Sequence, residues 1–241
     1  MLVDCDFETA SSVDLRLGGA WTFAEHPTTE VLCLVFRPEG GPTCHWFPGP
    51  GIFGVDNHLC LLALDPSVTF VAHNAQFEQA IWHHIMVPCY GFPEIPVERL
   101  EDTMATAAWK ALPLKLEKGA QAAKLPIEKD MEGNRLTLSM SRLNKKTGMY
   151  PERTPEVLTR IADYCAQDVA VEGAMRRKIG LLSDQSPHER GIWLLDQKIN
   201  QRGVRDDLDF VRQAQLVCDR ATVPLLAEFR DLTGGINPGQ V

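Results

Sequence analysis

Asp6 and Glu8 are the first residues whose types and spacing suit metal chemistry. They lie two residues apart in the segment LVDCDFET (2–9), where apolar and acidic residues alternate with the period of a half-buried strand. Side chains two apart on a strand point to the same face. Two carboxylates held together repel each other and raise each other's pKa unless a cation lies between them. The pair therefore indicates a site for a divalent cation.

Asp4 belongs to the same strand face by alternation, so periodicity leaves the pairs 4/6 and 6/8 both open. We expect Asp4 to lie nearer the exposed start of the strand. A third interpretation is an ordinary solvated strand face that carries all three acids.

The segment HNAQFE (73–78) is a second candidate, because an apolar strand (68–74) ends there and a helix (75–86) begins. Asn74 can cap this helix, and Phe77 can face the core. Glu78 lies in the first turn and can point back toward the strand ends. The helix dipole also favours Glu in a first turn, so an ordinary capped helix explains the same residues.

Tyr164 and Asp168 form a third candidate in the segment ADYCAQDVAVEG. Residues four apart on a helix stack on one face, so the phenol and the carboxylate point the same way. Both would then be expected to point at a polar partner. A purely structural hydrogen-bonded pair is the alternative.

Taken together, Asp6-Phe7-Glu8, the segment 74–78 and the Tyr164/Asp168 pair resemble the three motifs of the DEDD exonucleases, in the branch whose third motif carries Tyr. Further stretches, DFETAS, AHNAQFE, LEDT and LLDQKINQRGV, resemble phage-type family A DNA polymerases, so that the resemblance covers essentially the whole chain. It favours Asp6 with Glu8 over a pair that includes Asp4.

One position departs from the family pattern, because Glu78 stands where most of the family has Asp. The longer side chain puts the geometry of the second metal in doubt. Asp102, in LEDT, is the fallback acid. The resemblance otherwise implies that Asp102 is a supporting residue, which starts a helix behind the site.

The resemblance implies a 3′-5′ exonuclease of the proofreading type, which hydrolyses phosphodiester bonds at the 3′ end of single-stranded or frayed DNA. It implies two Mg²⁺ or Mn²⁺ ions, because hard oxygen ligands select these cations. The implied ligands are Asp6, Glu8, Glu78 and Asp168. Asp6 would bridge both ions, Glu8 and Asp168 would complete the ion that binds the attacking water, and Tyr164 would orient that water.

The candidate substrate-binding residues are Phe7, Thr9, Asn74, Phe77, Lys145 and Lys146. Unstacked nucleotides at a frayed 3′ end can stack on aromatic side chains, and the two phenylalanines flank the acids. Core packing explains each phenylalanine equally simply. The two lysines lie in the loop beside the third motif and can meet the phosphate backbone, or they belong to a solvated surface.

The elements that must position these residues follow from hydrophobic periodicity. Strands are expected at 2–9, 31–37, 43–47 and 68–74, and helices at 75–86, 102–111, 115–124, 131–142, 155–181, 187–201 and 207–232. Strands first and helices later predict an α/β fold, a mixed sheet with antiparallel N-terminal strands covered by helices. The family resemblance implies the RNase H-like exonuclease fold, followed by a helical C-terminal extension.

A change in composition at SDQSP (183–187) predicts a domain boundary. We expect the exonuclease domain over 1–185 and a helical extension over 186–241 that resembles the start of a family A polymerase region. The expected partners are a single-stranded DNA 3′ end and a polymerase domain in the same longer chain. This chain alone is not expected to polymerise DNA.

Composition sets further limits on function. The formal net charge of −8 argues against a nonspecific nucleic-acid coat protein, which needs a basic surface. Seven scattered cysteines without a CxxC pair predict reduced core thiols. The sequence has no long apolar run and no signal-like N-terminus, so we expect no membrane association and a soluble, cytoplasmic protein of a bacterial or phage-infected cell.

Three rival functions stay open at this point. An RNase D-like or oligoribonuclease-like 3′-5′ RNA exonuclease would use the same carboxylates and differ in a contact to the 2′-hydroxyl. A catalytically inactive nucleic-acid-binding or scaffold module would keep the fold without the chemistry. A purely structural acidic domain would require three independent coincidences of motif.

Overall fold

The computed structural model describes residues 1–49, 57–126, 130–144 and 147–239 of the chain. Its internal contacts divide the chain into two compact units, Met1–Gln201 and Arg202–Val241. The first unit contains a mixed sheet and the helices that cover it, and the second contains helix α11 (Leu208–Thr233).

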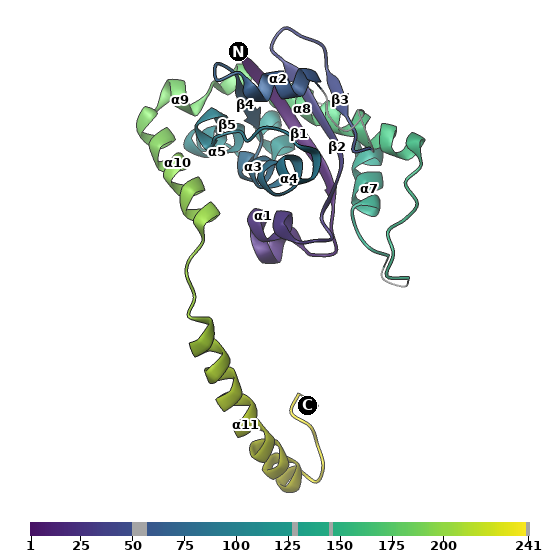
Figure 1. Cartoon of the computed structure of the whole chain (residues 1–241), viewed down its shortest axis with the longest axis vertical. Coiled ribbons are helices and arrows are strands. Elements are labelled where there is room, and N and C mark those ends of the chain that lie inside the picture. The colour runs from purple at the N-terminus through teal and green to yellow at the C-terminus, as the bar shows by residue number, and fades with distance from the viewer. Residues whose placement is uncertain (50–56, 127–129, 145–146, 240–241) are drawn as a thin grey trace. The chain divides into compact units, whose positions relative to one another are not determined.

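Five strands form one sheet in the described part of the first unit, in the order β3-β2-β1-β4-β5. They are β1 (Leu2–Ala10), β2 (Glu30–Pro38), β3 (Cys44–Trp46), β4 (Thr69–Ala72) and β5 (Leu100–Asp102). β1 pairs antiparallel with β2, and β2 antiparallel with β3, whereas β4 runs parallel to both β1 and β5. This mixed sheet with antiparallel N-terminal strands is RNase H-like, and it confirms the predicted fold class (Figure 1).

Helices connect the strands and cover the sheet. Their bounds are α1 (Leu15–Glu25), α2 (Asn57–Leu64), α3 (Ala75–Ile81), α4 (Val87–Tyr90), α5 (Thr103–Trp109), α6 (Leu116–Ala122), α7 (Met131–Met140), α8 (Pro155–Ile179), α9 (Leu182–Gln185) and α10 (Pro187–Arg202). A π-helical turn (Trp82–Met86) joins α3 to α4, and a 3-10 turn (Val97–Arg99) leads into β5.

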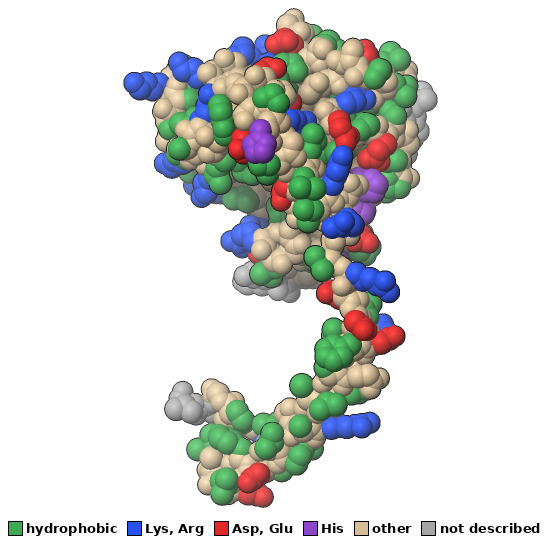
Figure 2. All heavy atoms as spheres, turned by 90° about the vertical axis from the view of Figure 1, so that its left-hand side faces the viewer, with side chains coloured by type: hydrophobic (Ala, Val, Ile, Leu, Met, Phe, Trp, Pro, Cys, Tyr) green, Lys and Arg blue, Asp and Glu red, His purple; other side chains and the backbone are tan. Residues whose placement is uncertain are grey.

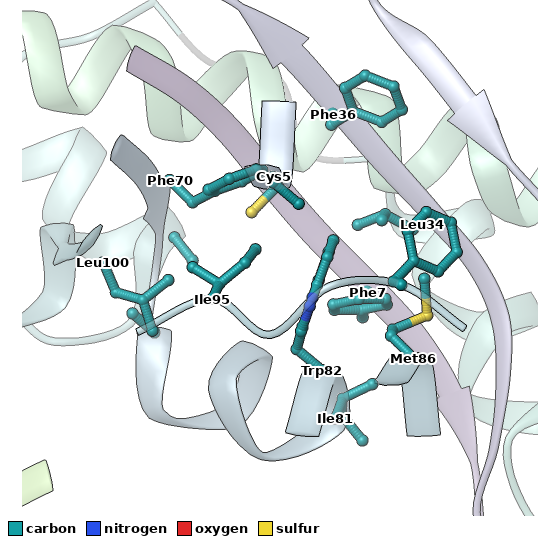
Figure 3. Close-up of a cluster of buried hydrophobic side chains, with 14 of the residues drawn as sticks. Cys5, Phe7, Leu34, Phe36, Phe70, Ile81, Trp82, Met86, Ile95 and Leu100 are labelled. Atoms are coloured by element: carbon teal, nitrogen blue, oxygen red, sulfur yellow. The ribbon is translucent and has the colours of Figure 1, made fainter. Parts of the chain in front are cut away.

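One face of the central strand β1 is apolar and carries the main core. Val3, Cys5 and Phe7 alternate on this face and are almost fully buried, as the period of a strand requires. The ring of Phe7 meets the indole of Trp82, from the π-helical turn, at a centroid distance of 6.2 Å. Figure 3 shows Phe70 and Leu34 in the same cluster. Burial of these side chains fixes β1 against the helical layer that contains α3.

The opposite face of β1 is acidic and is covered by α8. The hydroxyl of Thr154 caps the start of this helix, and Gly180 ends it at φ 80°. Gly173 lets the helix approach closely, because a Cβ there would lie 2.8 Å from Oδ2 of Asp4. The close approach brings the polar side chains of α8 onto the acidic side chains of β1.

Asp4 is buried, whereas the sequence places it at the exposed start of the strand. Arg176 of α8 accounts for the difference, since its Nε donates to Oδ1 of Asp4 at 2.8 Å and its second amino group donates to Oδ2 at 3.2 Å. The side chains of Asp4 and Arg176 are 4% and 6% exposed. Asp4 therefore already has a fixed cationic partner, a fact that the alternation pattern of the strand cannot reveal.

Several elements differ from the periodicity-based prediction. Helix α1 was not expected, and Gly19 interrupts its helical pattern with φ 74°. The expected helix 102–111 begins one residue later, because Asp102 ends the three-residue strand β5 and caps α5. No element was predicted for residues 58–64, which belong to helix α2. The remaining strands and long helices lie within a few residues of their predicted bounds.

Helix α10 packs within the first unit, although the sequence places the domain boundary before it, between residues 185 and 186. Arg190, Trp193 and Gln197 give this helix a buried face. The first compact unit therefore extends through Gln201 and includes nearly all of α10. The functional division into exonuclease domain and polymerase-like extension stays a prediction.

Helix α11 of the second unit carries exposed hydrophobic side chains along its length (Figure 2). They include Phe210, Val217, Leu225 and Leu232. Within the described residues, no helix combines the length and the apolar character that crossing a membrane would need.

We predict that Arg176→Met destabilises the first unit by about 3 to 5 kcal/mol, because it leaves the Asp4 carboxylate buried and unpaired. Urea unfolding followed by tryptophan fluorescence measures this loss. The matched control is Arg16→Met, which breaks the Arg16–Asp14 pair, whose side chains are 79% and 41% exposed. The control midpoint should not move. Equal losses in both variants would contradict the assignment of a stabilising role to the buried pair.

Candidate metal centre

Asp6 and Glu8 meet Cys165 where β1 packs against α8. Ligating atoms of these three residues all lie within 4.8 Å of one another. The Sγ of Cys165 donates to the backbone carbonyl of Asp6 at 3.2 Å and to its Oδ2 at 3.3 Å. Because Cys165 follows Tyr164 directly, the structure brings the first and third sequence motifs together.

A β-bulge adjoins the second acid of this group. Glu8 pairs with Cys33 and Thr9 pairs with Val31, so that Leu32 is an extra residue on β2. A bulge bends its strand and changes where the neighbouring side chains point. The bulge thus lies next to Glu8, whose side chain faces α8.

Burial and mutual repulsion control the protonation of the two acids. Burial, and then the charge of Asp168, raise the pKa of Asp6 from 3.8 to about 7. Burial, and then the charge of Asp6, raise the pKa of Glu8. Asp168 thus lies close enough to act on both acids electrostatically, from the helix face that Tyr164 shares. Carboxylates with raised pKa values form a site that gains from a bound cation.

Tyr164 is oriented by a residue of the neighbouring helix α7. Asn134 Nδ2 donates to the Tyr164 hydroxyl oxygen at 3.0 Å. Burial raises the pKa of Tyr164, and the negative charge of Asp168 raises it further. The phenol therefore keeps its proton at neutral pH and can donate it in a hydrogen bond. Asn134 fixes its position through this hydrogen bond, and Asp168 lies close enough to act on it electrostatically.

Glu78 lies in the first turn of α3, as the sequence predicts, and only 5% of it is exposed. It lines a small cavity together with Cys5, Phe7 and Trp82, and it is outside the group formed by Asp6, Glu8 and Cys165. Its Oε2 is buried and has no hydrogen-bond partner. Burial, and then the charge of Asp6, raise the pKa of Glu78.

Asn74 precedes α3 in a left-handed conformation, with φ 79°. Its side chain makes no capping hydrogen bond, contrary to the expectation from the sequence. Its backbone N–H instead donates to Oδ1 of Asp102 at 3.0 Å. Oδ1 also accepts from the backbone N–H groups of Met104 and Ala105 at 2.8 and 3.3 Å. Oδ1 of Asp102 is thus committed to backbone hydrogen bonds, as a supporting residue would be.

The structure places the candidate substrate-binding residues in different environments. Phe7 is 4% exposed and packs in the core, which leaves no ring face for a nucleotide base. Phe77 is half-buried and lies against Phe23 at a centroid distance of 5.8 Å. Thr9 is buried at the bulge. Lys145 and Lys146 lie outside the described residues.

Sequence reasoning did not identify Glu172, which is 2% exposed and has a buried Oε1 without a partner. Burial, and then the charge of Asp4, raise its pKa. The signal was present, because Glu172 and Arg176 continue the four-residue spacing of Tyr164 and Asp168 along α8. Asn134 and Cys165 were also not identified, and neither residue type has a spacing that marks it.

The donor set fits a hard divalent cation. Asp6 and Glu8 offer carboxylate oxygens beside the Sγ of Cys165, and Asp168 lies near enough to act on both acids electrostatically. The buried Oε2 of Glu78, outside this group, has no hydrogen-bond partner in the protein. Repulsion among these acids raises their pKa values, and a cation would remove this repulsion. The arrangement can hold a cation beside a phenol that donates a hydrogen bond, which suits the activation of a water molecule.

Comparison with known proteins relates the chain to a phage enzyme. It is 33% identical, over 242 residues, to the DNA polymerase of Bacillus phage SP02. The similarity covers 97% of this chain and 36% of that polymerase, so the chain spans about a third of its relative's length. No protein-family model matches the sequence. The predicted resemblance to a phage-type DNA polymerase is therefore confirmed.

The structure also resembles solved nucleases in part. Escherichia coli RNase D, an exoribonuclease, superposes with a TM-score of 0.49 and 14% identity, over 84% of this chain and 46% of that one. Brucella melitensis NrnC superposes with a TM-score of 0.41 and 14% identity, over 82% and 80% of the two chains.

We predict a pH-dependent effect of Asp6→Asn on stability. The pKa of Asp6 is raised from 3.8 to about 7, so the folded state binds the proton more tightly than the unfolded state does. This contribution is present in full below the lower value and is lost as the pH rises to the upper one. In EDTA, the variant should therefore gain thermal stability over wild type as the pH is raised from about 5 to 8.

Thermal unfolding with and without Mn²⁺ completes this test. At pH 8, Mn²⁺ should raise the Tm of wild type by several degrees, because cation binding selects the folded state. The variant should respond much less. A parallel shift of both proteins at every pH would contradict an acidic cation site that includes Asp6.

Proposed function

We propose that the chain is a divalent-metal-dependent 3′-5′ exonuclease that acts on single-stranded or frayed DNA ends, in the manner of a proofreading domain. The observation that carries the proposal is the packing of Asp6 and Glu8 against the α8 face with Tyr164 and Asp168. The similarity to a phage DNA polymerase supports DNA as the substrate. A polymerase domain in the same longer chain is the proposed partner.

Asp6, Glu8, Glu78 and Asp168 are the residues proposed to hold two Mg²⁺ or Mn²⁺ ions. When bound, such ions supply an activated hydroxide and neutralise charge on the phosphate and the leaving oxygen. Glu78 belongs to this set because its buried Oε2 has no protein partner and because the charge of Asp6 acts on it. Its extra methylene, compared with Asp, lengthens its reach from α3.

The protein's own groups then orient the reactants. Tyr164, held by Asn134 and Asp168, is a hydrogen-bond partner for the attacking water. Phe77, which is half-buried and precedes Glu78, is the aromatic residue proposed to contact the terminal nucleotide. Lys145 and Lys146 are proposed to contact the phosphate backbone. Thr9 and Asn74 are proposed to shape the site through the backbone, at the bulge and before α3.

The first functional prediction concerns a 5′-labelled single-stranded DNA oligonucleotide. Wild type should shorten it from the 3′ end in Mg²⁺ or Mn²⁺ and leave it intact in EDTA. Asp6→Ala should lower the rate by roughly 10²- to 10³-fold or more, the scale of losing one preorganised transition-state contact. Denaturing gel electrophoresis measures the products.

The matched control is Asp163→Ala, which removes an exposed carboxylate from the same helix as Asp168. It should leave the rate unchanged. A matching RNA oligonucleotide runs in parallel, and faster cleavage of RNA would replace the DNA assignment with a ribonuclease. Intact DNA and RNA in both cations would reject the exonuclease proposal.

The second functional prediction separates the phenol from the residue that orients it. Asn134→Ala should lower kcat by about 10- to 100-fold with little change in KM, because removal of an outer partner misplaces a reacting group. Tyr164→Phe should lower kcat at least as much, and the double variant should lose little more. Ser139→Ala, at an exposed position of the same helix α7, is the control. Independent, additive losses would contradict an action of Asn134 through Tyr164.

A further inference from the structure

Helix α10 is connected to the candidate site through one indole N–H. Trp193 Nε1 donates to Oδ2 of Asp102 at 3.3 Å. The two residues are 9% and 4% exposed, so this hydrogen bond is shielded from water. A buried hydrogen bond to a carboxylate is more directional and stronger than one at the surface. Trp193 is ninety-one positions away from Asp102 in the sequence.

The two carboxylate oxygens of Asp102 have separate partners. Oδ1 accepts the backbone N–H groups of Asn74, Met104 and Ala105. Oδ2 accepts from Trp193. The plane of the carboxylate is therefore set from both sides. Without the indole N–H, the Asp102 carboxylate is free to rotate about its χ2 angle. The direction of the hydrogen bond that Oδ1 accepts from the backbone N–H of Asn74 is then no longer fixed.

Asn74 transmits this constraint to Glu78. Its left-handed backbone, at φ 79°, turns the chain from β4 into α3, and asparagine is among the few non-glycine residues that adopt this conformation readily. Its carbonyl accepts from Phe77 N at 2.8 Å, within the same helical turn that carries Glu78. The direction of the first turn of α3 thus determines where the Glu78 carboxylate can lie.

Arg190 fixes Trp193 against β5. Its guanidinium lies 4.5 Å from the centroid of the Trp193 ring. The same side chain pairs with Glu101 at 3.2 Å and donates to the carbonyl oxygen of Leu100. Lys198, further along α10, pairs with Glu98 at 2.7 Å. Helix α10 is therefore bound to β5 and to the 3-10 turn before it at several points, among them the hydrogen bond from Trp193 to Asp102.

We propose that Trp193 is a positioning residue, which holds Glu78 in place through Asp102 and Asn74. The inference rests on the proposed function, because it gives Glu78 a role as a cation ligand. It assigns to α10 a part in the site that neither the three motifs nor the expected boundary at residue 185 includes.

Trp193→Phe tests the proposal, because it keeps an aromatic ring and removes the N–H donor. Mn²⁺ binding is measured in the absence of DNA, by calorimetry and by the electron paramagnetic resonance signal of the free ion. The variant should bind at least one Mn²⁺ about 10- to 100-fold more weakly, the range for loss of an outer partner of a ligand. Trp46→Phe is the control for the loss of a buried indole, and its Mn²⁺ affinity should equal that of wild type.

A double-mutant cycle identifies the ligand through which Trp193 acts. The effects of Trp193→Phe and Glu78→Gln on Mn²⁺ affinity should be strongly non-additive, because both act on the same ligand. The effects of Trp193→Phe and Glu8→Gln should add. Additivity in both cycles, or unchanged affinity in Trp193→Phe, would overturn the inference.

The failure of this inference is distinguishable from failure of the proposed function. If wild type binds Mn²⁺ and degrades DNA while Trp193→Phe matches it in both, only the positioning role is lost. If wild type binds no Mn²⁺, the cation site itself is rejected and both proposals fall. If wild type binds Mn²⁺ without degrading DNA or RNA, the exonuclease proposal falls, and the binding cycle still decides the role of Trp193.

Discussion

Burial of like charges between β1 and α8 is the constraint on which the arrangement of this fold depends. Asp6 and Glu8 project from the strand, and Asp168 and Glu172 project from the helix, into a partly desolvated medium, in which the first three acids are half-buried and Glu172 is buried. Repulsion in such a medium costs free energy and raises pKa values. Arg176 compensates at one end of the strand, beside Asp4. The rest of the structure must hold the other acids together against their repulsion.

The surrounding elements show how this is achieved. The apolar face of β1 is fixed by the aromatic cluster around Trp82, so the acidic face cannot turn toward solvent. β2 pairs with β1 along most of its length, and β4 pairs with its first residues, Leu2 to Asp4. Outer residues then fix the functional groups one by one, as Asn134 does for Tyr164. Burial of the apolar core and the hydrogen bonds of neighbouring helices thus offset the free-energy cost of repulsion among the acids.

Local periodicity predicted much of the fold and of the candidate site. The period of two brought Asp6 and Glu8 to one face, and the spacing of four did the same for Tyr164 and Asp168. Local periodicity did not predict the features that depend on contacts between residues distant in the sequence. Asp4 is buried because Arg176 lies opposite, and β5 forms from only three residues because β4 offers an edge. The contact of Trp193 with Asp102 has no local signature at all.

Gly173 has a consequence for how this sequence can vary. A side chain at position 173 would place its Cβ against the Asp4 carboxylate. Arg176 holds this carboxylate, so it cannot move aside. Even alanine would push the helix off the strand and separate the two rows of acids. Natural drift and laboratory libraries should therefore retain glycine at this position as strictly as they retain the acids. An invariant position of this kind would be easy to mistake for a flexible hinge, although its function is to permit close packing.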